Sequence, residues 1–569
     1  MAKYDKIIKN GTIVDGQRTP RFTGDIGIKD GRVAVIGNID SSEGDEILDA
    51  TGLIVAPGFI DLHTHYDSQV FWDPYCTISG WHGVTSVAIG NCGFGFAPVK
   101  GTQEERDRAM LTMSRNEAVP LESMQEGMPW DWETYPEFLD SLERTPKGVN
   151  LLTYMALNPL MAYVMGIEAA KSRPANEEEM AEMERLMEEG MAAGACGWSA
   201  QLGGENDVQR DYDGTSMITN VMSEDDLVSF AQVLRKVGRG FIQCIGAGKE
   251  LTETLASESG RPVIWNVLAV ATDQHGIAMP GYKETMAWLD DANSRGIRIF
   301  AQALTAENNF QFTFENWNLF DSSPVWREMT IGTPEERKEK LADPERRAAA
   351  KEEYDNAPYG GAGVVFSFED LIVGEIEDEE LRKENEGLTV GEIAEKEGKH
   401  VIDAMLDLAV ADNLQALFVT APRPNDMAAM KEMANSAFAL PGVSDGGAHT
   451  KFITLGRYPT EFLALLVRDN EVMDLEAAHW RLSAYPALAA GFKDRGVIKE
   501  GSPADIVVYD LDALEMGETE KAYDFPAGAW RLIRKPKGYR WIMVNGGVTF
   551  EDGECTGSTP GALLRHGTA

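Results

Sequence analysis

The chain has 569 residues, of which 43% are hydrophobic and 25% are charged, and its formal net charge is −40. This composition is typical of a soluble globular protein, and the length allows one large domain with a smaller companion. The negative charge makes nucleic acid and anionic membrane surfaces poor partners, because their phosphates repel such a surface.

The termini and the cysteines indicate the compartment. The chain opens on a polar segment that leads directly into a strand-like stretch, so we expect no signal peptide. It has no apolar run of about 18 residues, the length that a membrane span requires. The five cysteines are scattered without the spacing of a disulfide framework, which favours a reducing cytoplasm.

Short β-strands are expected at both ends of the chain. Residues 6–16 and 25–37 each form strands around tight turns, and residues 501–510 and 540–550 have the same pattern. The simplest interpretation is one small β-sandwich built from residues 1–55 together with 491–569. Two separate end domains are the alternative.

Residues 56–490 alternate short apolar runs with longer amphipathic stretches. The predicted strands are 56–65, 84–90, 149–155, 194–199, 240–245, 262–268, 297–302 and 440–445. Residues 176–193 have helical spacing and strong helix formers, and we expect the methionines there to pack in the core. Eight strands alternating with helices predict an α/β protein, a (β/α)8 TIM-type barrel of parallel strands. Functional sites in that fold lie at the carboxyl ends of the strands.

The seventh and eighth predicted strands are separated by a long insertion, at about 305–438, which exceeds a single helix. It contains an aromatic stretch, residues 310–320, and a charged run, residues 334–354, which we interpret as a solvated helix face. The aromatic residues, together with Trp198, could shape an apolar acyl pocket, although core packing is the simpler expectation. Long barrel insertions often carry function, so a lid or an oligomer contact is expected here.

His63 and His65 end the first predicted strand. Side chains alternate along a strand, so these two imidazoles share one face and Thr64 points away. Two imidazoles on one face at a strand end can chelate a metal ion. The alternative is that both are polar residues of a turn.

Three further segments extend this pattern to a known family. Residues 57–65, PGFIDLHTH, resemble the first barrel strand of the metal-dependent amidohydrolase superfamily. Residues 90–99, GNCGFGFAPV, and 193–202, AGACGWSAQL, resemble the N-acyl-D-amino-acid deacylase (D-aminoacylase) branch. The resemblance implies that Cys92 is a zinc ligand and that no carboxylated lysine is used. It also implies the sandwich at the two termini.

Asp445 follows the last predicted strand. A carboxylate at that strand end can bind a metal ion and accept a proton from water, and the resemblance implies the aspartate of the superfamily, which is both ligand and general base. His449 then contacts substrate or metal, or is simply a loop histidine. A substrate carboxylate requires a cation, for which Arg457, Lys249 and Lys451 follow strand ends.

The chain departs from the branch where histidines normally follow strands five and six. The fifth strand reads FIQCI and the sixth WNVLAV, and the turn after the third strand also lacks a histidine. One divalent ion, zinc, is the most economical interpretation, with two ions as the alternative. Gln243, Cys244 or His275 could substitute in part for the missing ligands.

These features predict a cytoplasmic, metal-dependent hydrolase of a linear amide C–N bond in a small molecule. The metal ligands are His63, His65, Cys92 and Asp445. Opening of a cyclic amide, or deamination at a ring carbon, is an alternative reaction. A barrel without catalytic metal, serving as a binding or assembly subunit, is the alternative of another class. Homo-oligomerisation is left open.

Overall fold

The structure is a computed structural model. It describes residues 2–205, 207, 209–272, 278–306, 311–315, 319–356, 366–420, 426–452 and 455–567. Within these ranges no helix is long and apolar enough to cross a membrane.

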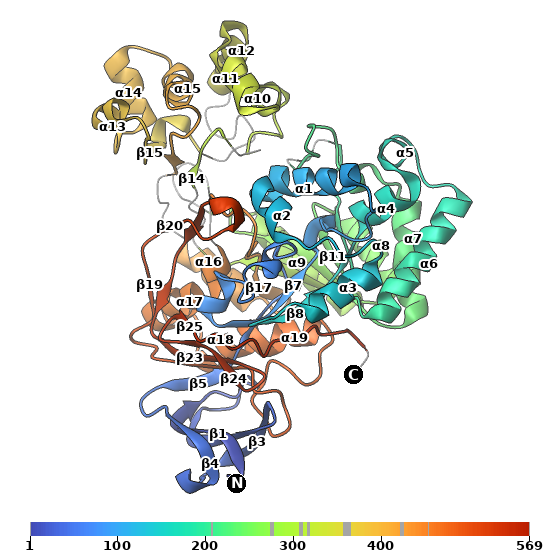
Figure 1. The fold of residues 1–569 in the computed structure, drawn as a ribbon, viewed down its shortest axis with the longest axis vertical. Helices are drawn as coiled ribbons and strands as arrows, with labels where there is room; N and C mark the ends of the chain where they lie inside the picture. The colour runs from blue at the N-terminus through green and yellow to red at the C-terminus, as the bar shows by residue number, and fades with distance from the viewer. Residues whose placement is uncertain are drawn as a thin grey trace.

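Strands from the two ends of the chain share one nine-stranded sheet. The N-terminal strands are β1 (Tyr4–Ile13), β2 (Phe22–Lys29), β3 (Arg32–Gly37), β4 (Gly44–Asp49) and β5 (Ile54–Pro57). The C-terminal strands are β18 (Ile506–Tyr509), β23 (Tyr539–Val544), β24 (Gly547–Glu551) and β25 (Glu554–Cys555). Strand β5 joins the two sets, because it pairs parallel with β1 and antiparallel with β18. The sheet lies at the lower end of the molecule in Figure 1.

The central part of the chain forms parallel strands in sequence order. One sheet contains β6 (Phe59–Asp61), β7 (Val84–Ile89) and β8 (Asn150–Thr153), and the other contains β9 (Met155–Ala156), β10 (Gly197–Gln201), β11 (Phe241–Ile245), β12 (Val263–Leu268), β13 (Ile299–Leu304) and β17 (Ala439–Gly442). Only Tyr154 separates β8 from β9. Beyond the other ends, Thr64 and Gly446 form a parallel bridge between the segments that follow β6 and β17. The expected α/β class with parallel strands is confirmed.

Several strands differ from their predicted bounds, and the first predicted strand, 56–65, is divided between β5 and β6 and ends at Asp61. Two of the differences have local reasons. Strand β10 begins at Gly197 because Gly194, still part of the preceding turn, caps the helix with its N–H on the carbonyls of Gly190 and Met191. Strand β17 ends at Gly442 because Val443, with φ 55°, leaves the extended conformation.

Helices connect the parallel strands. They include α1 (Gln103–Glu117), α2 (Leu121–Gly127), α3 (Tyr135–Arg144), α4 (Leu157–Met165), α5 (Ile167–Ser172), α6 (Glu177–Ala193), α7 (Glu224–Val237), α8 (Lys249–Ser259), α9 (Gly281–Ser294) and α16 (Met427–Asn435). Helix α6 matches its prediction closely, because Asn176 and Glu179 form a capping box at its start. Its Met183, Met187 and Met191 are buried, as the spacing predicts.

The insertion between β13 and β17 has a hydrophobic core of its own. It contains α10 (Pro324–Thr330), α11 (Pro334–Ala342), α12 (Pro344–Asn356), α13 (Glu379–Asn385), α14 (Val390–Glu397) and α15 (Val401–Ala411), with the short antiparallel strands β14 (Gln311–Phe312), β15 (Ile372–Val373) and β16 (Phe418–Val419). Phe312, Phe314 and Phe320 pack in this core, whereas Phe310 and Trp317 lie outside the described residues. Figure 1 shows helices α10–α15 standing above the body, at the end remote from β1 and β4.

A buried ion pair anchors the insertion to helix α1. The Arg115 guanidinium donates to both oxygens of Asp321, at 2.5 and 3.2 Å, and to the carbonyl of Thr330 at 3.0 Å. Asp321 is fully buried. Burial raises its pKa to about 6, against the opposing charge of Arg115. An ionised Asp321 carboxylate would therefore destabilise the folded protein if its arginine were removed.

We expect Arg115→Met to lower the free energy of unfolding by roughly 3 kcal/mol at pH 8, because it leaves a buried carboxylate without its partner. Asp321 ionises at lower pH in the unfolded chain than in the folded one, so its contribution to stability declines as pH rises through about 4 to 6. Without Arg115 this decline extends to higher pH. The difference in free energy of unfolding between the parent and the variant therefore grows from pH 5 to pH 8. Urea unfolding at both pH values measures it.

The matched control is Arg185→Met, which removes an exposed arginine paired with Glu182 and Glu189. Such pairs contribute about 0–1 kcal/mol, so its stability changes little at either pH. Equal losses in both variants would contradict the role of the Arg115–Asp321 pair.

Candidate metal centre

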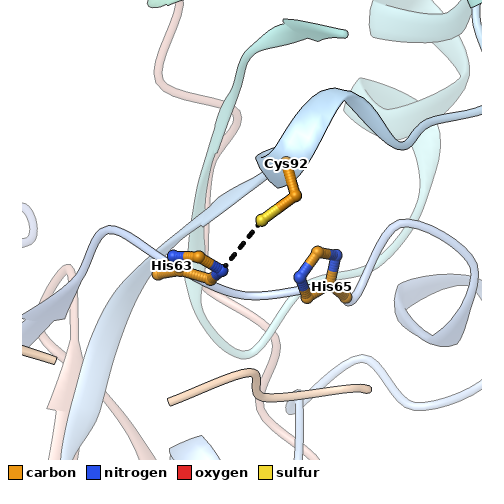
Figure 2. Close-up of side chains that lie close together, drawn as sticks. All are labelled: His63, His65 and Cys92. Carbon is orange, nitrogen blue, oxygen red and sulfur yellow. Dashed lines mark hydrogen bonds between the residues drawn. The ribbon is translucent and has the colours of Figure 1, made fainter. Parts of the chain in front are cut away.

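His63 and His65 lie on one side of the segment that follows β6. The Thr64 hydroxyl donates to the carbonyl of Ala88 at 2.7 Å, which turns that side chain toward β7. The two imidazole rings lie 5.5 Å apart between centroids, and both are buried. The alternation predicted from the sequence is therefore present, and Figure 2 shows His63 and His65 beside Cys92.

Cys92 reaches the histidines from a tight turn after β7. Gly90, Cys92 and Gly93 all have left-handed backbones, with φ 82°, 56° and 75°. For Cys92 this conformation costs about 1 kcal/mol or more, and such strain is often found at functional sites. The turn brings the thiol sulfur to 3.3 Å from His63 Nε2. Ligand atoms of His63, His65 and Cys92 all lie within 4.8 Å of one another.

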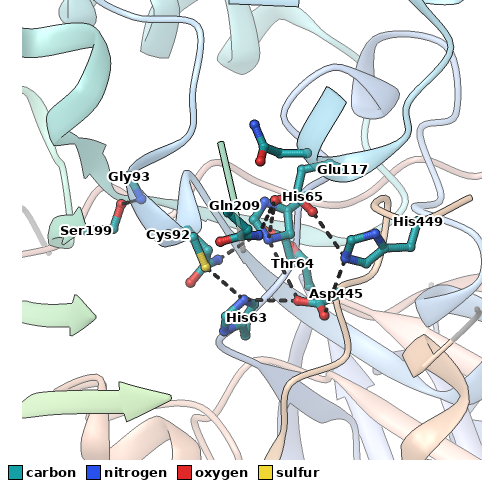
Figure 3. Close-up of polar contacts among 12 residues, drawn as sticks. His63, Thr64, His65, Cys92, Gly93, Glu117, Ser199, Gln209, Asp445 and His449 are labelled. Carbon is teal, nitrogen blue, oxygen red and sulfur yellow. Dashed lines mark hydrogen bonds and ion pairs between the residues drawn. The ribbon is translucent and has the colours of Figure 1, made fainter. Parts of the chain in front are cut away.

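Asp445 approaches the same two histidines from the segment that follows β17, the last of the parallel strands. Its Oδ1 lies 3.1 Å from His63 Nε2 and 3.8 Å from His65 Nε2. Asp445 also has a left-handed backbone, with φ 46°. Two imidazoles, a thiol and a carboxylate are the donor types that zinc prefers, and the His65 Nδ1 atom is buried without a hydrogen bond. The donor set therefore fits a divalent metal ion (Figure 3).

The protonation of these groups suits metal binding. Burial and the nearby charge of His63 lower the pKa of His65 to about 3, so its ring stays neutral, the form that ligates metals. Burial works to lower the pKa of His63, but Cys92 and Asp445 outweigh it and raise that pKa. Burial also opposes ionisation of Asp445, yet His63 lowers the pKa of its carboxyl below the usual range. A proton and a cation thus compete for the space between His63, Cys92 and Asp445.

Glu117, at the end of helix α1, completes the ring of side chains. Its Oε1 lies 3.8 Å from His65 Nε2 and its Oε2 lies 3.5 Å from His449 Nε2. His449 Nε2 is in turn 4.0 Å from Asp445 Oδ2. Glu117 is fully buried, and burial together with Asp445 raises the pKa of its carboxyl. Figure 3 shows the carboxylate between the two histidines.

Sequence analysis missed Glu117. It ends an acidic, arginine-rich helix between Asn116 and Ala118, where a charged residue normally faces solvent. No local pattern distinguishes it from the other glutamates of that helix, because its approach to His65 depends on tertiary structure.

A chain of three buried amides lies beneath the metal donors. The Cys92 N–H donates to Gln243 Oε1 at 2.7 Å, Gln243 Nε2 donates to Asn266 Oδ1 at 2.9 Å, and Asn266 Nδ2 donates to Gln302 Oε1 at 2.8 Å. Gln302 Oε1 lies 3.2 Å from His63 Nδ1. Asn266 Nδ2, a donor, also lies 3.0 Å from His63 Nδ1. In the tautomer whose Nδ1–H donates to Gln302, His63 Nε2 keeps the lone pair that a metal takes. The amides therefore orient both Cys92 and His63.

These amides come from three consecutive parallel strands, β11, β12 and β13. A single amide within each of three otherwise apolar runs is the sequence signal that could have revealed them. Gln243 was considered only as a substitute ligand, and it lies near the thiol, with Nε2 3.8 Å from Cys92 Sγ. Cys244, the other substitute, is on the opposite face of β11, where it lies within hydrogen-bonding reach of Thr252 of α8. His275 lies outside the described residues.

The candidate substrate-binding cations have different partners. Lys249 is exposed at the start of α8, with its ammonium 5.7 Å from the centre of the Trp288 ring. Arg457 is buried and donates to Glu461 at 3.1 Å. Lys451 is buried over Trp530.

Trp198 is also a core residue. It is fully buried, and its indole N–H donates to the carbonyl of Phe230 on α7 at 3.3 Å. Trp198 therefore packs between strand β10 and helix α7, which agrees with the expectation of core packing.

Comparison with known proteins adds a family. Residues 46–531 match the sequence profile of the amidohydrolase family. An uncharacterised protein of Mycobacterium tuberculosis is 28% identical over 97% of this chain and 93% of its own length. An N-acyl-D-glutamate deacylase of Alcaligenes xylosoxydans xylosoxydans is 26% identical over 99% of this chain and 97% of its own length. The solved structure of an N-acyl-D-glutamate deacylase from Bordetella bronchiseptica, complexed with zinc and a phosphonate inhibitor, has the same fold. Its TM-score is 0.65, at 20% identity over 99% of this chain and 100% of that one.

We expect Gln302→Leu to weaken zinc binding by about 10- to 100-fold, the usual cost of losing a hydrogen bond that orients a ligating histidine. Gln302→Glu keeps an acceptor for His63 Nδ1–H and should retain most of the affinity. Competition with a chromophoric chelator measures both. If the two variants bind zinc as the parent chain does, the amide chain does not orient His63.

Proposed function

Because the chain belongs to the amidohydrolase family, we propose that it hydrolyses the amide bond of N-acyl-D-amino acids, releasing a carboxylic acid and a free D-amino acid. The family assignment confirms the expected class, a metal-dependent amidohydrolase resembling the N-acyl-D-amino-acid deacylases. The substrate itself is a proposal, supported by the names of two full-length relatives, which act on N-acyl-D-aspartate and N-acyl-D-glutamate.

The observation that carries the proposal is the convergence of His63, His65, Cys92 and Asp445, described above, beyond the carboxyl ends of parallel strands. These four residues would hold the metal ion. A bound divalent cation supplies positive charge that polarises an amide carbonyl and makes a nearby water more acidic.

Asp445 is the proposed general base. His63 keeps its carboxyl ionised, which a proton acceptor requires. Asp445 would take a proton from the attacking water at one carboxylate oxygen and then deliver it to the leaving nitrogen, so that the amine departs neutral. His449, which lies beside the second oxygen of Asp445, is the proposed contact for the substrate.

Two cations, Lys249 and Arg457, are the candidates for binding the substrate carboxylate. Lys249 is exposed and can turn toward a ligand, whereas Arg457 would first have to release Glu461. We therefore favour Lys249 over Arg457 for this role, since breaking a buried ion pair is costly.

We also infer the architecture that brings these residues together. The eight parallel strands, with β8 and β9 counted as one, are proposed to close into a (β/α)8 barrel of residues 56–490. The Thr64–Gly446 bridge supports closure, since it joins the segments after the first and last strands. Residues 1–55 and 491–569 are proposed to form the companion β domain, which the shared nine-stranded sheet supports.

The alternative of a catalytically degenerate barrel has one specific observation in its favour. Strands five and six, β11 and β12, carry Gln243 and Asn266. Neither strand is directly followed by the histidine that the resemblance to the deacylase branch leads us to expect. The four converging donors argue against it, because a binding subunit has no use for a buried thiol and two imidazoles around one carboxylate. They favour hydrolysis at a single metal ion.

We expect Asp445→Asn to reduce kcat by about 10²- to 10⁴-fold, the range that general acid–base catalysis provides. Asp225→Asn, at an exposed position in the first turn of α7, is the control and should leave kcat unchanged. The measurements are elemental analysis of the purified protein and acid release from matched D and L N-acyl amino acids. Unchanged turnover in Asp445→Asn would remove Asp445 from the mechanism. Release of ammonia, or opening of a cyclic amide, would instead support one of the alternative reactions.

A further inference from the structure

A second concave site lies at the opposite end of the parallel strands. Arg239, Arg261 and Arg298 lie one or two residues before β11, β12 and β13, which are consecutive and parallel. The three arginines therefore lie at one edge of the sheet, while Cys92 and Asp445 follow strands at the other edge. They line a cavity of about 860 Å³.

The lining of this cavity is strongly basic. It includes seven cationic side chains and two carboxylates, Glu143 and Asp494. The cations are Arg32, Arg239, Arg261, Arg298, Lys493, Arg495 and Arg565. In a chain with 92 acidic and 52 basic residues, a cluster of positive charge is unexpected from composition alone.

Two of the seven cations are neutralised. Arg495 pairs with Asp505, and Arg565 pairs with Glu143 and with Asp140. The other five lie more than 4.0 Å from every carboxylate oxygen among the described ranges of the chain. The cavity thus holds an excess of positive charge that the described residues do not balance.

Backbone carbonyls hold several of these guanidinium groups in place without neutralising them. Arg32 donates to Gly501 O at 2.7 Å, Arg298 donates to Gly260 O at 3.0 Å, and Arg239 donates to the carbonyls of Met191 and His566. The Arg261 Nε–H group is buried and has no hydrogen-bond acceptor. Burial lowers the pKa of Arg261, and the charge of Arg298 lowers it further. An anion between these two arginines would relieve their repulsion.

The shape and chemistry of the cavity define the ligand. Guanidinium groups bind phosphate and carboxylate oxygens with two parallel hydrogen bonds. We propose that this cavity binds a small anion of at least two negative charges, of the phosphate or polycarboxylate class, remote from the metal centre. Nucleic acid is excluded because charge is screened over about 8 Å at physiological salt, and a long polyanion would meet the acidic surface beyond the cavity.

The test is titration of the full-length protein with pyrophosphate and, separately, with citrate, at constant ionic strength set by chloride. Calorimetry should show saturable binding near one ligand per chain for at least one of the two. Arg261→Gln and Arg298→Gln should each weaken binding by about 10-fold or more, since each removes a charge-assisted hydrogen bond to the anion. Arg185→Gln, at an exposed position on helix α6, is the control and should bind as the parent does.

The two probes distinguish the two ligand classes. Binding of pyrophosphate alone assigns the phosphate class, and binding of citrate alone assigns the polycarboxylate class. Equal affinity in the parent and both cavity variants, or saturable binding of neither probe, would overturn the site. Arg298 is exposed, so its variant keeps the test decisive if Arg261→Gln fails to fold. Acid release from N-acyl amino acids is measured separately, so failure here leaves the proposed hydrolase function untouched.

Discussion

The hydrogen bond from the His65 N–H to the Gly446 carbonyl, at 2.7 Å, is the contact on which the metal centre depends. It joins the segment after the first parallel strand to the segment after the last, which lie almost 400 residues apart in the sequence. A second bond, from the Ser444 hydroxyl to the His63 carbonyl at 3.0 Å, holds the same junction. Because these bonds fix the backbone on both sides, the two imidazoles and the Asp445 carboxylate meet without further adjustment. The positive φ of Asp445 is tolerated for the same reason, since the surrounding contacts determine its conformation.

Around this junction, burial decides the electrostatics. A buried charge is costly unless another charge or a hydrogen bond compensates for it. In this centre His63 Nε2 interacts with both Cys92 and Asp445, and His63 Nδ1 contacts the amide of Gln302. The amides are neutral, so they orient the donors without adding to the charge that must be balanced. This separates two tasks, since ionisable side chains face the proposed metal position and neutral amides hold them.

The sequence was sufficient wherever the signal is local. The strands were predicted because buried parallel strands are short apolar runs, and helix α6 because its cap and its residue types agree. His63 and His65 were identified from the period of two along a strand. Cys92 and Asp445 needed the family resemblance, since a cysteine or an Asp-Gly pair in a loop is usually structural. Glu117 could not be found, because its contact with His65 depends on how α1 packs.

Helix α1 also relates the insertion to the centre. Arg115, which holds Asp321 and Thr330 of the insertion, is two residues from Glu117, which lies between His65 and His449. The Glu117 carbonyl accepts a hydrogen bond from the His449 N–H, so the end of α1 is tied to the loop that follows Asp445. Ala118, the cap of α1, packs in the core of the insertion. A displacement of the insertion would therefore move Glu117 and His449 together, while the amide chain keeps His63 and Cys92 fixed. His63 and Cys92 are thus positioned by the parallel strands, whereas Glu117 and His449 are positioned by helix α1, which contacts the insertion.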